Sequence, residues 1–350
     1  MELAMPVVWS DACLLHDPGG EIWVGVRTPA VETTERIEAI RAALLEGGAR
    51  LVEAEPHEDE ALLEVHDPGL VEYLRTVWGE WEAAGLPEDP GQDRVVPYVF
   101  AHPGLGSTLR VPAAVWAKPG FYAYDTMTLV GPGTWEAARA AADAALTAVD
   151  LVLEGEPFAY ACTRPPGHHV TRTAFGGSCY LNSAAVAAAS LRARVGGPVA
   201  VLDVDAHHGN GTQEIFRECS DVLTGSVHVD PGEGWFPHFV GFAEENDDAN
   251  RNLLMAPGWG DEPWLGAVAE LAAWARSHGV VALVVALGVD AAAADPESPL
   301  QVSAGGYREA GRLLGALGVS TVVVQEGGYH LESIGPLVLG ALLGLEEGGS

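Results

Sequence analysis

The sequence predicts an α/β fold in which helices cover both faces of one central parallel β-sheet. Short segments that are apolar along their whole length alternate with longer segments of helical periodicity, and strands buried on both faces are typical of parallel sheets. Polar residues directly follow four of these apolar segments. The chain has 350 residues and is 48% hydrophobic, so it can bury a large core. Because no repeat or linker divides it, we expect a single domain over residues 1–350.

The first part of the chain is less regular than the rest. Residues 85–133 are rich in glycine, proline and aromatic side chains and have no clean period, so we expect an irregular loop region with a functional role there. The acidic run at 53–60 is typical of a solvated loop. Three regular elements are expected before residue 85: a strand at 6–9 and helices at 31–45 and 68–81.

From residue 134 onward, the alternation is regular. Thr134 is expected to cap an alanine-rich helix that extends to about residue 153. The segments after it alternate between buried strands and amphipathic helices. Strands are expected at 158–162, 198–204, 222–229, 280–287 and 320–325, and helices at 182–194, 262–277, 305–317 and 333–345.

Composition limits the partners and the location. The 49 acidic and 18 basic residues give a net charge of −31, which disfavours nucleic acid and would attract polycations, although acidic residues often only solvate a surface. No apolar run approaches the roughly 20 residues that span a bilayer, and the start lacks the features of a signal peptide. We therefore expect no membrane partner and a cytoplasmic location. The four cysteines form no CxxC pair and are expected to be reduced.

The most informative segment is 201–211, VLDVDAHHGNG, in which an apolar strand ends in two aspartates and two histidines. Since a strand alternates its faces with period two, Asp203, Asp205 and His207 start on one face. They lie at the carboxyl end of the strand, where open α/β sheets bind ligands. Carboxylate oxygen and imidazole nitrogen suit Zn²⁺ or a similar divalent ion.

Three further polar clusters follow predicted strands: RPPGHH at 164–169, GVD at 288–290 and EGGY at 326–329. A lone histidine or aspartate after a strand is more often a cap or a hydrogen-bonded core group. Parallel strands, however, would place all four clusters at one edge of the sheet. The sequence therefore predicts a composite site at that edge.

These clusters contain a set of groups that suits metal-assisted hydrolysis of an amide. Three carboxylate and imidazole side chains could hold a metal and leave positions open for water and substrate. The tandem histidines could supply a general base and a general acid, and the tyrosine could donate to an oxyanion. Short polar groups could orient the histidines from behind. The residues in these four roles are Asp205, His207 and Asp290; His168 and His169; Tyr329; and Asp203 and Asn210.

Six successive motifs resemble those of the zinc-dependent histone deacetylase superfamily, especially its bacterial acetylpolyamine amidohydrolase and class II-like branch. The resemblance extends from about residue 121 to 346, with a weak extension to the HDP at 66–68. It implies the arginase-deacetylase fold, one Zn²⁺ per chain and hydrolysis of an N-acyl amide on a small amine or a lysine. The motifs are RPPGHH, GGSCYLN, DVDAHHGNGTQ, SVHVDP, GVDAAAADP and QEGGYH.

The resemblance also implies roles for individual residues. Asp205, His207 and Asp290 match the zinc ligands. His169 matches the general base toward a metal-activated water, and His168 matches an electrostatic group that could help protonate the leaving amine. Tyr329 matches the tyrosine that polarises the acyl carbonyl and stabilises the oxyanion.

Two groups of supporting residues follow from the same resemblance. Asp203 and Asn210 match the residues behind the first and second histidine, and Asn210 stands where class I enzymes have an aspartate. A neutral partner raises the pKa of His169 less than a carboxylate would. A potassium ion is implied as well, with ligands from Asp203, Ser226 and the backbone carbonyls of Asp205, His207 and Val227.

The substrate tunnel is expected to be formed by Gly177, Ser178 and Phe236, with Asp125 at its rim holding substrate amide groups. Ser178 stands where the family usually has Phe or Tyr, whereas the opposite wall, Phe236, is retained. We therefore expect a wider tunnel that tolerates acyl groups larger than acetyl or an aryl-bearing chain.

Two other functions stay open. An arginase-like dinuclear manganese hydrolase would need a further carboxylate two residues after His207, where Gly209 stands. A non-catalytic acyl-amine binding protein would be expected to have lost one of the ligands, histidines or Tyr329. The substrate is also open between an acetylpolyamine, a protein acyl-lysine and an acylated natural product. Related polyamine hydrolases are dimers whose inserted loop narrows the channel, and residues 85–133 could form that loop in a homodimer.

Overall fold

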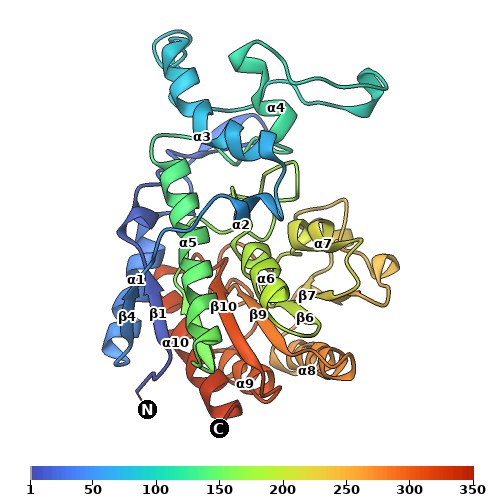
Figure 1. The fold of residues 1–350 in the computed structure, drawn as a ribbon. Coiled ribbons are helices and arrows are strands. Elements are labelled where there is room, and N and C mark those ends of the chain that lie inside the picture. The colour runs from blue at the N-terminus through green and yellow to red at the C-terminus, as the bar shows by residue number, and fades with distance from the viewer. Residues whose placement is uncertain (1) are drawn as a thin grey trace.

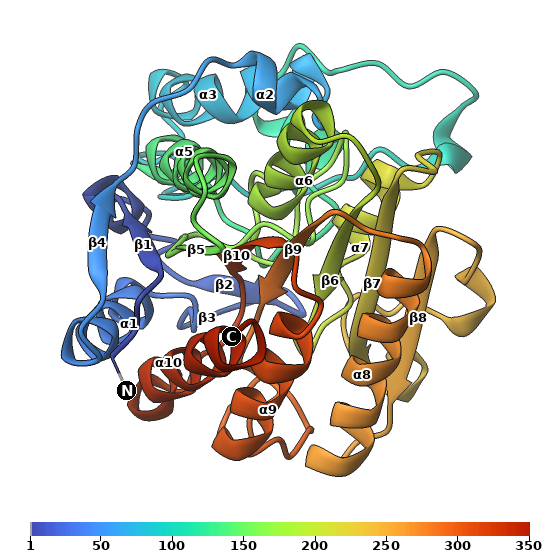
Figure 2. The same ribbon diagram turned by 60° about the horizontal axis from the view of Figure 1, so that its bottom comes forward.

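The computed structural model describes residues 2–350 and has a parallel eight-stranded sheet at its centre (Figures 1 and 2). The strand order is β4-β1-β5-β10-β9-β6-β7-β8, and every neighbouring pair is parallel. The strands are β1 (Pro6–Trp9), β4 (Arg50–Glu53), β5 (Phe158–Ala161), β6 (Val199–Asp203), β7 (Val222–Val229), β8 (Asn250–Met255), β9 (Ala282–Leu287) and β10 (Ser320–Gln325).

Helices cover both faces of the sheet, as Figure 2 shows. The central strands β5, β6 and β9 are buried at every position, and a sheet without a polar face needs a helical layer on each side. One layer contains α5 (Thr134–Leu153) and α6 (Ser183–Arg194), and the other contains α1 (Thr34–Glu46), α8 (Asp261–Ser277), α9 (Ala304–Gly315) and α10 (Leu331–Gly348). The helix α3 (Pro68–Ala83) lies beyond the end of α5, at the top of Figure 1. The predicted α/β class with a parallel sheet is confirmed.

The pair α9 and α10 packs closely because glycines of each helix face the backbone of the other. A Cβ on Gly344 would lie 1.9 Å from the carbonyl oxygen of Arg308, and a Cβ on Gly311 would lie 2.1 Å from that of Ala341. Backbone-to-backbone contact of this kind leaves no room for a methyl group. The two helices therefore depend on glycine at these positions.

We expect Gly344→Ala to lower the free energy of unfolding by about 2 kcal/mol, because the new methyl must push the helices apart. Gly340→Ala, one turn earlier in α10, is the matched control. Its Cβ would meet only the carbonyl oxygen of Ala304, at 3.9 Å, so it should be neutral or stabilising by up to about 1 kcal/mol. Urea unfolding of both variants measures this, and equal effects would contradict the packing described here.

Several elements were not predicted from the sequence. The edge strands β4 and β8 are only partly buried, so they lack the continuous apolar pattern of the central strands. Three short helices and a two-stranded hairpin were also missed: α2 (Glu60–Leu63), α4 (Pro119–Tyr122), α7 (Asn210–Phe216), β2 (Glu21–Trp23) and β3 (Val26–Thr28).

The expectation that Thr134 caps α5 is wrong. Thr134 is the first residue of the helix, and Gly133 precedes it in the left-handed conformation with φ of 74°. The Thr134 hydroxyl instead accepts a hydrogen bond from the N–H of Gly131 at 2.9 Å and contacts Nδ1 of His16 at 3.0 Å. It holds the preceding turn, which sequence patterns do not distinguish from a cap.

Residues 85–133 form an irregular arm at the top of Figure 1. The longest regular element there is the one-turn helix α4 (Pro119–Tyr122). The arm exposes apolar side chains, with Tyr98 and Leu105 both 71% exposed and Trp116 51% exposed.

Within residues 2–350, no helix is both long and apolar enough to cross a membrane. The four cysteines are free, and Cys219 alone among them is not buried.

Candidate metal centre and active site

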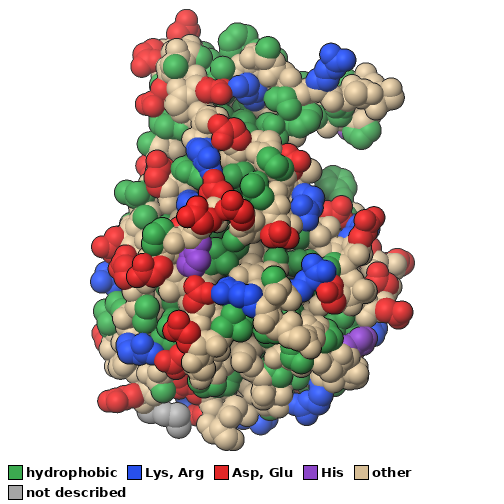
Figure 3. All heavy atoms as spheres, viewed as in Figure 1, with side chains coloured by type: hydrophobic (Ala, Val, Ile, Leu, Met, Phe, Trp, Pro, Cys, Tyr) green, Lys and Arg blue, Asp and Glu red, His purple; other side chains and the backbone are tan. Residues whose placement is uncertain are grey.

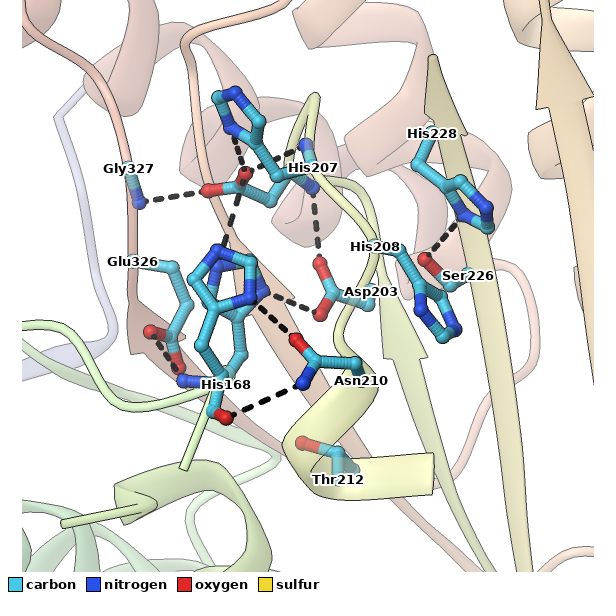
Figure 4. A network of polar contacts seen from close by, with 12 residues as sticks. His168, Asp203, His207, His208, Asn210, Thr212, Ser226, His228, Glu326 and Gly327 are labelled. Carbon is cyan, nitrogen blue, oxygen red and sulfur yellow. Dashed lines mark hydrogen bonds and ion pairs between the residues drawn. The ribbon is translucent and has the colours of Figure 1, made fainter. Parts of the chain in front are cut away.

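The four polar clusters meet at one edge of the sheet because β5, β10, β9 and β6 are consecutive neighbours in the strand order. Each cluster follows the carboxyl end of one of these parallel strands. The loops therefore lie side by side, and Figure 4 shows side chains from three of the clusters, those after β5, β6 and β10, converging on one region. The prediction that the four clusters meet at one edge of the sheet is confirmed.

Asp205, His207 and Asp290 offer three ligand atoms that all lie within 4.8 Å of one another. Nδ1 of His207 is 2.9 Å from Oδ2 of Asp290 and 3.3 Å from Oδ1 of Asp205. Both aspartates are fully buried. Two carboxylates and one imidazole that converge in this way fit a divalent cation.

Backbone N–H groups from neighbouring loops orient both carboxylates. Oδ2 of Asp205 accepts the N–H of Gly327 at 2.8 Å, and Oδ1 of Asp290 accepts the N–H of Ala206 at 2.8 Å. Glycine is required beside them, since a Cβ on Gly288 would lie 1.9 Å from Oδ2 of Asp205. The carboxylates are therefore held in place by contacts that do not involve a metal.

The electrostatics of the carboxylates also suit a cation. Burial, together with the neighbouring charge of Asp205, raises the pKa of Asp290 to about 7. Burial alone would raise the pKa of Asp205, but the charges of His168 and His207 hold that pKa well below its usual range. A divalent cation between the two carboxylates would favour the ionised form of both.

The tandem histidines have different partners and different protonation states. Nδ1 of His168 is 2.9 Å from Oδ2 of Asp203, and Nδ1 of His169 is 2.7 Å from Oδ1 of Asn210. Burial lowers the pKa of His168, but the charges of Asp205 and Asp203 outweigh burial and raise this pKa to about 10. For His169, burial and the neighbouring charge of His168 place the pKa well below its usual value.

This asymmetry assigns separate chemistry to the two rings. His168 keeps its proton at neutral pH, whereas His169 is unprotonated and can accept one. Pairs of titratable groups whose environments separate their pKa values are typical of acid–base sites. The rings are close, with centroids 4.0 Å apart.

Tyr329 stands on the turn that follows β10. Burial raises the pKa of its phenol well above the usual value, and the nearby Arg36 only partly offsets this. The phenol therefore carries its proton at neutral pH and can donate a hydrogen bond. The guanidinium carbon of Arg36 lies 4.5 Å from the centroid of the tyrosine ring.

Glu326 and Arg36 belong to the site but were not assigned a role from the sequence. Oε2 of Glu326 accepts the N–H groups of Gly167 and His168, at 2.7 and 3.1 Å, and thereby joins two of the loops (Figure 4). A buried carboxylate directly after β10 was the available signal for Glu326. The sequence offers no comparable signal for Arg36, because its partners at Glu326 and Gly328 are about 290 residues away along the chain.

The residues expected to bind potassium lie behind the first histidine. Asp203 and Ser226 are paired in register across β6 and β7, and Val227 follows Ser226. Oδ1 of Asp203 accepts the N–H of Asp205 at 3.0 Å. The hydroxyl of Ser226 contacts Nδ1 of His228 at 2.8 Å (Figure 4).

Phe236 and Gly177 lie beside His169, where a tunnel was expected. The rings of Phe236 and His169 meet edge to face with centroids 4.8 Å apart. A Cβ on Gly177 would lie 2.3 Å from Cδ2 of His169 and 2.9 Å from the Phe236 ring. Ser178 follows in the left-handed conformation, with φ of 60°, and its N–H donates to the hydroxyl of Thr128 at 2.8 Å.

Asp125 accepts four hydrogen bonds from its neighbours. Its Oδ1 accepts the N–H groups of Met127 and Thr128, and its Oδ2 accepts the N–H of Gly177 at 2.6 Å and the Thr128 hydroxyl at 3.2 Å. The carboxylate therefore holds the loop of Gly177 and Ser178, and its contact with a substrate stays a prediction.

Comparison with known proteins gives the class of enzyme. Residues 30–345 match the model of the histone deacetylase domain. The chain is 37% identical over 347 residues to acetylpolyamine amidohydrolase of Mycoplana ramosa, covering 97% of this chain and 99% of that protein. It is 34% identical over 345 residues to acetylpolyamine amidohydrolase 1 of Pseudomonas aeruginosa, covering 97% and 98%. The protein is accordingly an amidohydrolase of the deacetylase class.

Solved structures agree with this assignment. The crystal structure of acetylpolyamine aminohydrolase from Burkholderia pseudomallei matches with a TM-score of 0.92 and 36% identity, covering 98% of both chains. The HDA15 HD domain matches with a TM-score of 0.76 and 26% identity, covering 98% of this chain and 91% of that one. The chain belongs to the histone deacetylase domain family, which implies a metal cofactor. The resemblance seen in the six motifs is confirmed.

Proposed function

We propose that the protein is a zinc-dependent deacetylase that hydrolyses acetylpolyamines. The observation that carries the proposal is the convergence of Asp205, His207 and Asp290. Beside them lie His168, whose ring pairs with the Asp203 carboxylate, and His169, whose ring pairs with the neutral Asn210 amide. The relatives named acetylpolyamine amidohydrolases support the substrate class. The net charge of −31 also suits a cationic amine, and acidic side chains are spread over the face seen in Figure 3.

In this proposal, Asp205, His207 and Asp290 would hold one Zn²⁺, which would polarise the acyl carbonyl and lower the pKa of a water when bound. His169 accepts the proton of the attacking water at Nε2, because Asn210 occupies its Nδ1. Tyr329 donates its phenol proton in a hydrogen bond to the developing oxyanion. The carboxylates of Asp205 and Asp290 are held by the backbone N–H groups of Gly327 and Ala206, and the ring of His169 is held by the amide of Asn210.

His168 has a different task in the same proposal. The carboxylate of Asp203 occupies its Nδ1 and favours the charged ring. The positive charge stabilises the negative charge that develops on the substrate. It can also supply a proton to the leaving amine through Nε2. A potassium ion on Asp203, Ser226 and the carbonyls of Asp205, His207 and Val227 would support the loop from behind.

The alternative of a dinuclear manganese site is disfavoured by Gly209. A second metal would need a carboxylate at this position, but a Cβ there would lie 2.3 Å from Oδ2 of Asp203. The position therefore has no space for a side chain unless Asp203 moves.

The deacetylase proposal also includes a homodimer. The dimer would form through the exposed apolar side chains of the arm at 85–133, among them Tyr98, Leu105 and Trp116.

A substrate panel tests the proposed function. The zinc-loaded enzyme is assayed with acetylputrescine, acetylspermidine, an acetyl-lysine peptide and longer acyl reporters, each with a hydroxamate control. We expect kcat/KM for the acetylpolyamines to exceed that for the peptide by at least about tenfold, because their free ammonium group, which an acetylated lysine side chain lacks, adds a specific contact. Hydroxamate binding without turnover of any substrate would instead indicate a binding protein.

The longer acyl reporters test the width of the tunnel. Because Ser178 is small, we expect hydrolysis of acyl groups larger than acetyl, and Ser178→Phe should abolish it while sparing acetyl substrates. A strict preference of the wild type for acetyl would rule out the wider tunnel without affecting the assignment as a deacetylase.

A further inference from the structure

Asp295 connects the loop after β9 to the turn that carries Tyr329. Its Oδ2 accepts the N–H of Tyr329 at 2.6 Å and the N–H of His330 at 3.1 Å. Its Oδ1 accepts the N–H of Glu297 in its own loop at 3.1 Å. Asp295 is buried. It lies five residues after the proposed ligand Asp290 but is not part of the ligand set.

Arg36 of α1 holds the same turn from its other side. Its Nη2 donates to the carbonyl of Glu326 at 2.8 Å, and its Nε donates to the carbonyl of Gly328. Nη1 of Arg36 pairs with Oε1 of Glu32 at 2.7 Å, which fixes the guanidinium. The backbone of residues 326–330 is thus held through its carbonyls by a cation and through its N–H groups by an anion.

The turn needs such contacts because of its composition. Gly327 and Gly328 directly precede Tyr329, and Gly328 has φ of +125°. Glycine allows the widest range of backbone conformations, so the sequence of the turn does not itself fix the tyrosine. A hydroxyl that stabilises a transition state must be placed closely, since a displacement of about 1 Å can cost about a hundredfold in rate.

We propose that Asp295 is a positioning residue that holds the hydroxyl of Tyr329 in place for the reaction. The inference rests on the proposed deacetylase function and deepens it. Asp295 does not touch the substrate; it acts by fixing the two N–H groups of the turn opposite Arg36. It should therefore contribute to kcat only through the Tyr329 hydroxyl.

Steady-state kinetics on acetylputrescine test this inference with the purified zinc form. We expect Asp295→Ala to lower kcat about 10- to 100-fold while KM changes by less than about twofold. Asp295→Asn should recover part of the loss, because its amide oxygen can still accept one N–H. In a Tyr329→Phe background, Asp295→Ala should change kcat by less than about twofold, since the hydroxyl that it positions is already gone.

Asp247→Ala is the matched control. Its Oδ1 likewise accepts two backbone N–H groups, those of Ala249 and Asn250, both at 2.7 Å, but its loop carries no site residue. We expect its kcat to be unchanged. If Asp295→Ala does not fold, the Asp295→Asn variant and its Tyr329→Phe double variant take its place, with the same expected non-additivity.

Amide hydrogen exchange supplies a readout that does not depend on activity. In Asp295→Asn, exchange should quicken at least about tenfold in the peptide that contains residues 326–330. Unchanged exchange in this peptide would overturn the inference. So would a loss of kcat/KM that comes from a higher KM instead of a lower kcat. A third contrary result would be a double variant in which the kcat losses of Asp295→Ala and Tyr329→Phe multiply. An inactive wild type would refute the proposed function alone, while exchange would still test the contact of Asp295 with the turn.

Discussion

Asp290→Ala is expected to lose the metal, and its kcat/KM is expected to fall at least about a thousandfold. This fall corresponds to several kcal/mol of transition-state stabilisation. Asp290 is fully buried, and its Oδ2 lies 2.9 Å from Nδ1 of His207. Without it, only two of the three converging ligands are left, and the N–H of Ala206 loses its acceptor. Metal content after dialysis and turnover of acetylputrescine measure the effect.

Asp261→Ala provides the control for this experiment. Asp261 also accepts a backbone N–H, that of Ser303 at 2.7 Å, but it is not among the ligands of the metal centre. It should keep one metal per chain and wild-type turnover. A metal content of one per chain in Asp290→Ala, with turnover close to that of the wild type, would show that the ligand set is wrong.

Tyr329→Phe is expected to lower kcat by about 100- to 1000-fold with little change in KM, because a single donor to an oxyanion contributes that much. Burial keeps the phenol protonated, so the wild-type hydroxyl is a donor at neutral pH. The phenylalanine ring retains the place of the tyrosine ring beside Arg36. The loss should therefore report on the hydroxyl and not on folding.

Tyr73→Phe is the matched control for the loss of a buried hydroxyl. Tyr73 is buried on α3, and among residues 2–350 its hydroxyl has no hydrogen-bond partner. Its removal should leave kcat and KM unchanged. A Tyr329→Phe variant with wild-type kcat would exclude the tyrosine from the reaction and favour stabilisation by other groups.

The composite site could be predicted from the sequence because the residues that carry its chemistry come directly after strands. Asp205, His207, Asp290 and the tandem histidines all stand at the carboxyl ends of continuously apolar strands, and a parallel sheet brings such ends together. The strand order was not needed for this step. The structure adds that β5, β10, β9 and β6 are neighbours, which explains how short the distances between the clusters are.

What the sequence did not predict depends on hydrogen bonds to the backbone. Asp295 and Arg36 bind N–H and carbonyl groups of a distant turn, and such partners have no side-chain pattern to recognise. The part that Asp125 plays in holding the loop of Gly177 was missed for the same reason, since three of its four contacts are with backbone N–H groups. The edge strands were missed because solvent on one side permits polar residues.

The central claim is that one metal ion, held by Asp205, His207 and Asp290, supports deacetylation. A zinc titration of the chelator-stripped enzyme, with acetylputrescine turnover as readout, tests it most directly. We predict negligible turnover without metal and a linear rise that stops at one equivalent per chain. A rise that continues to two equivalents, or full turnover after stripping, would contradict the account.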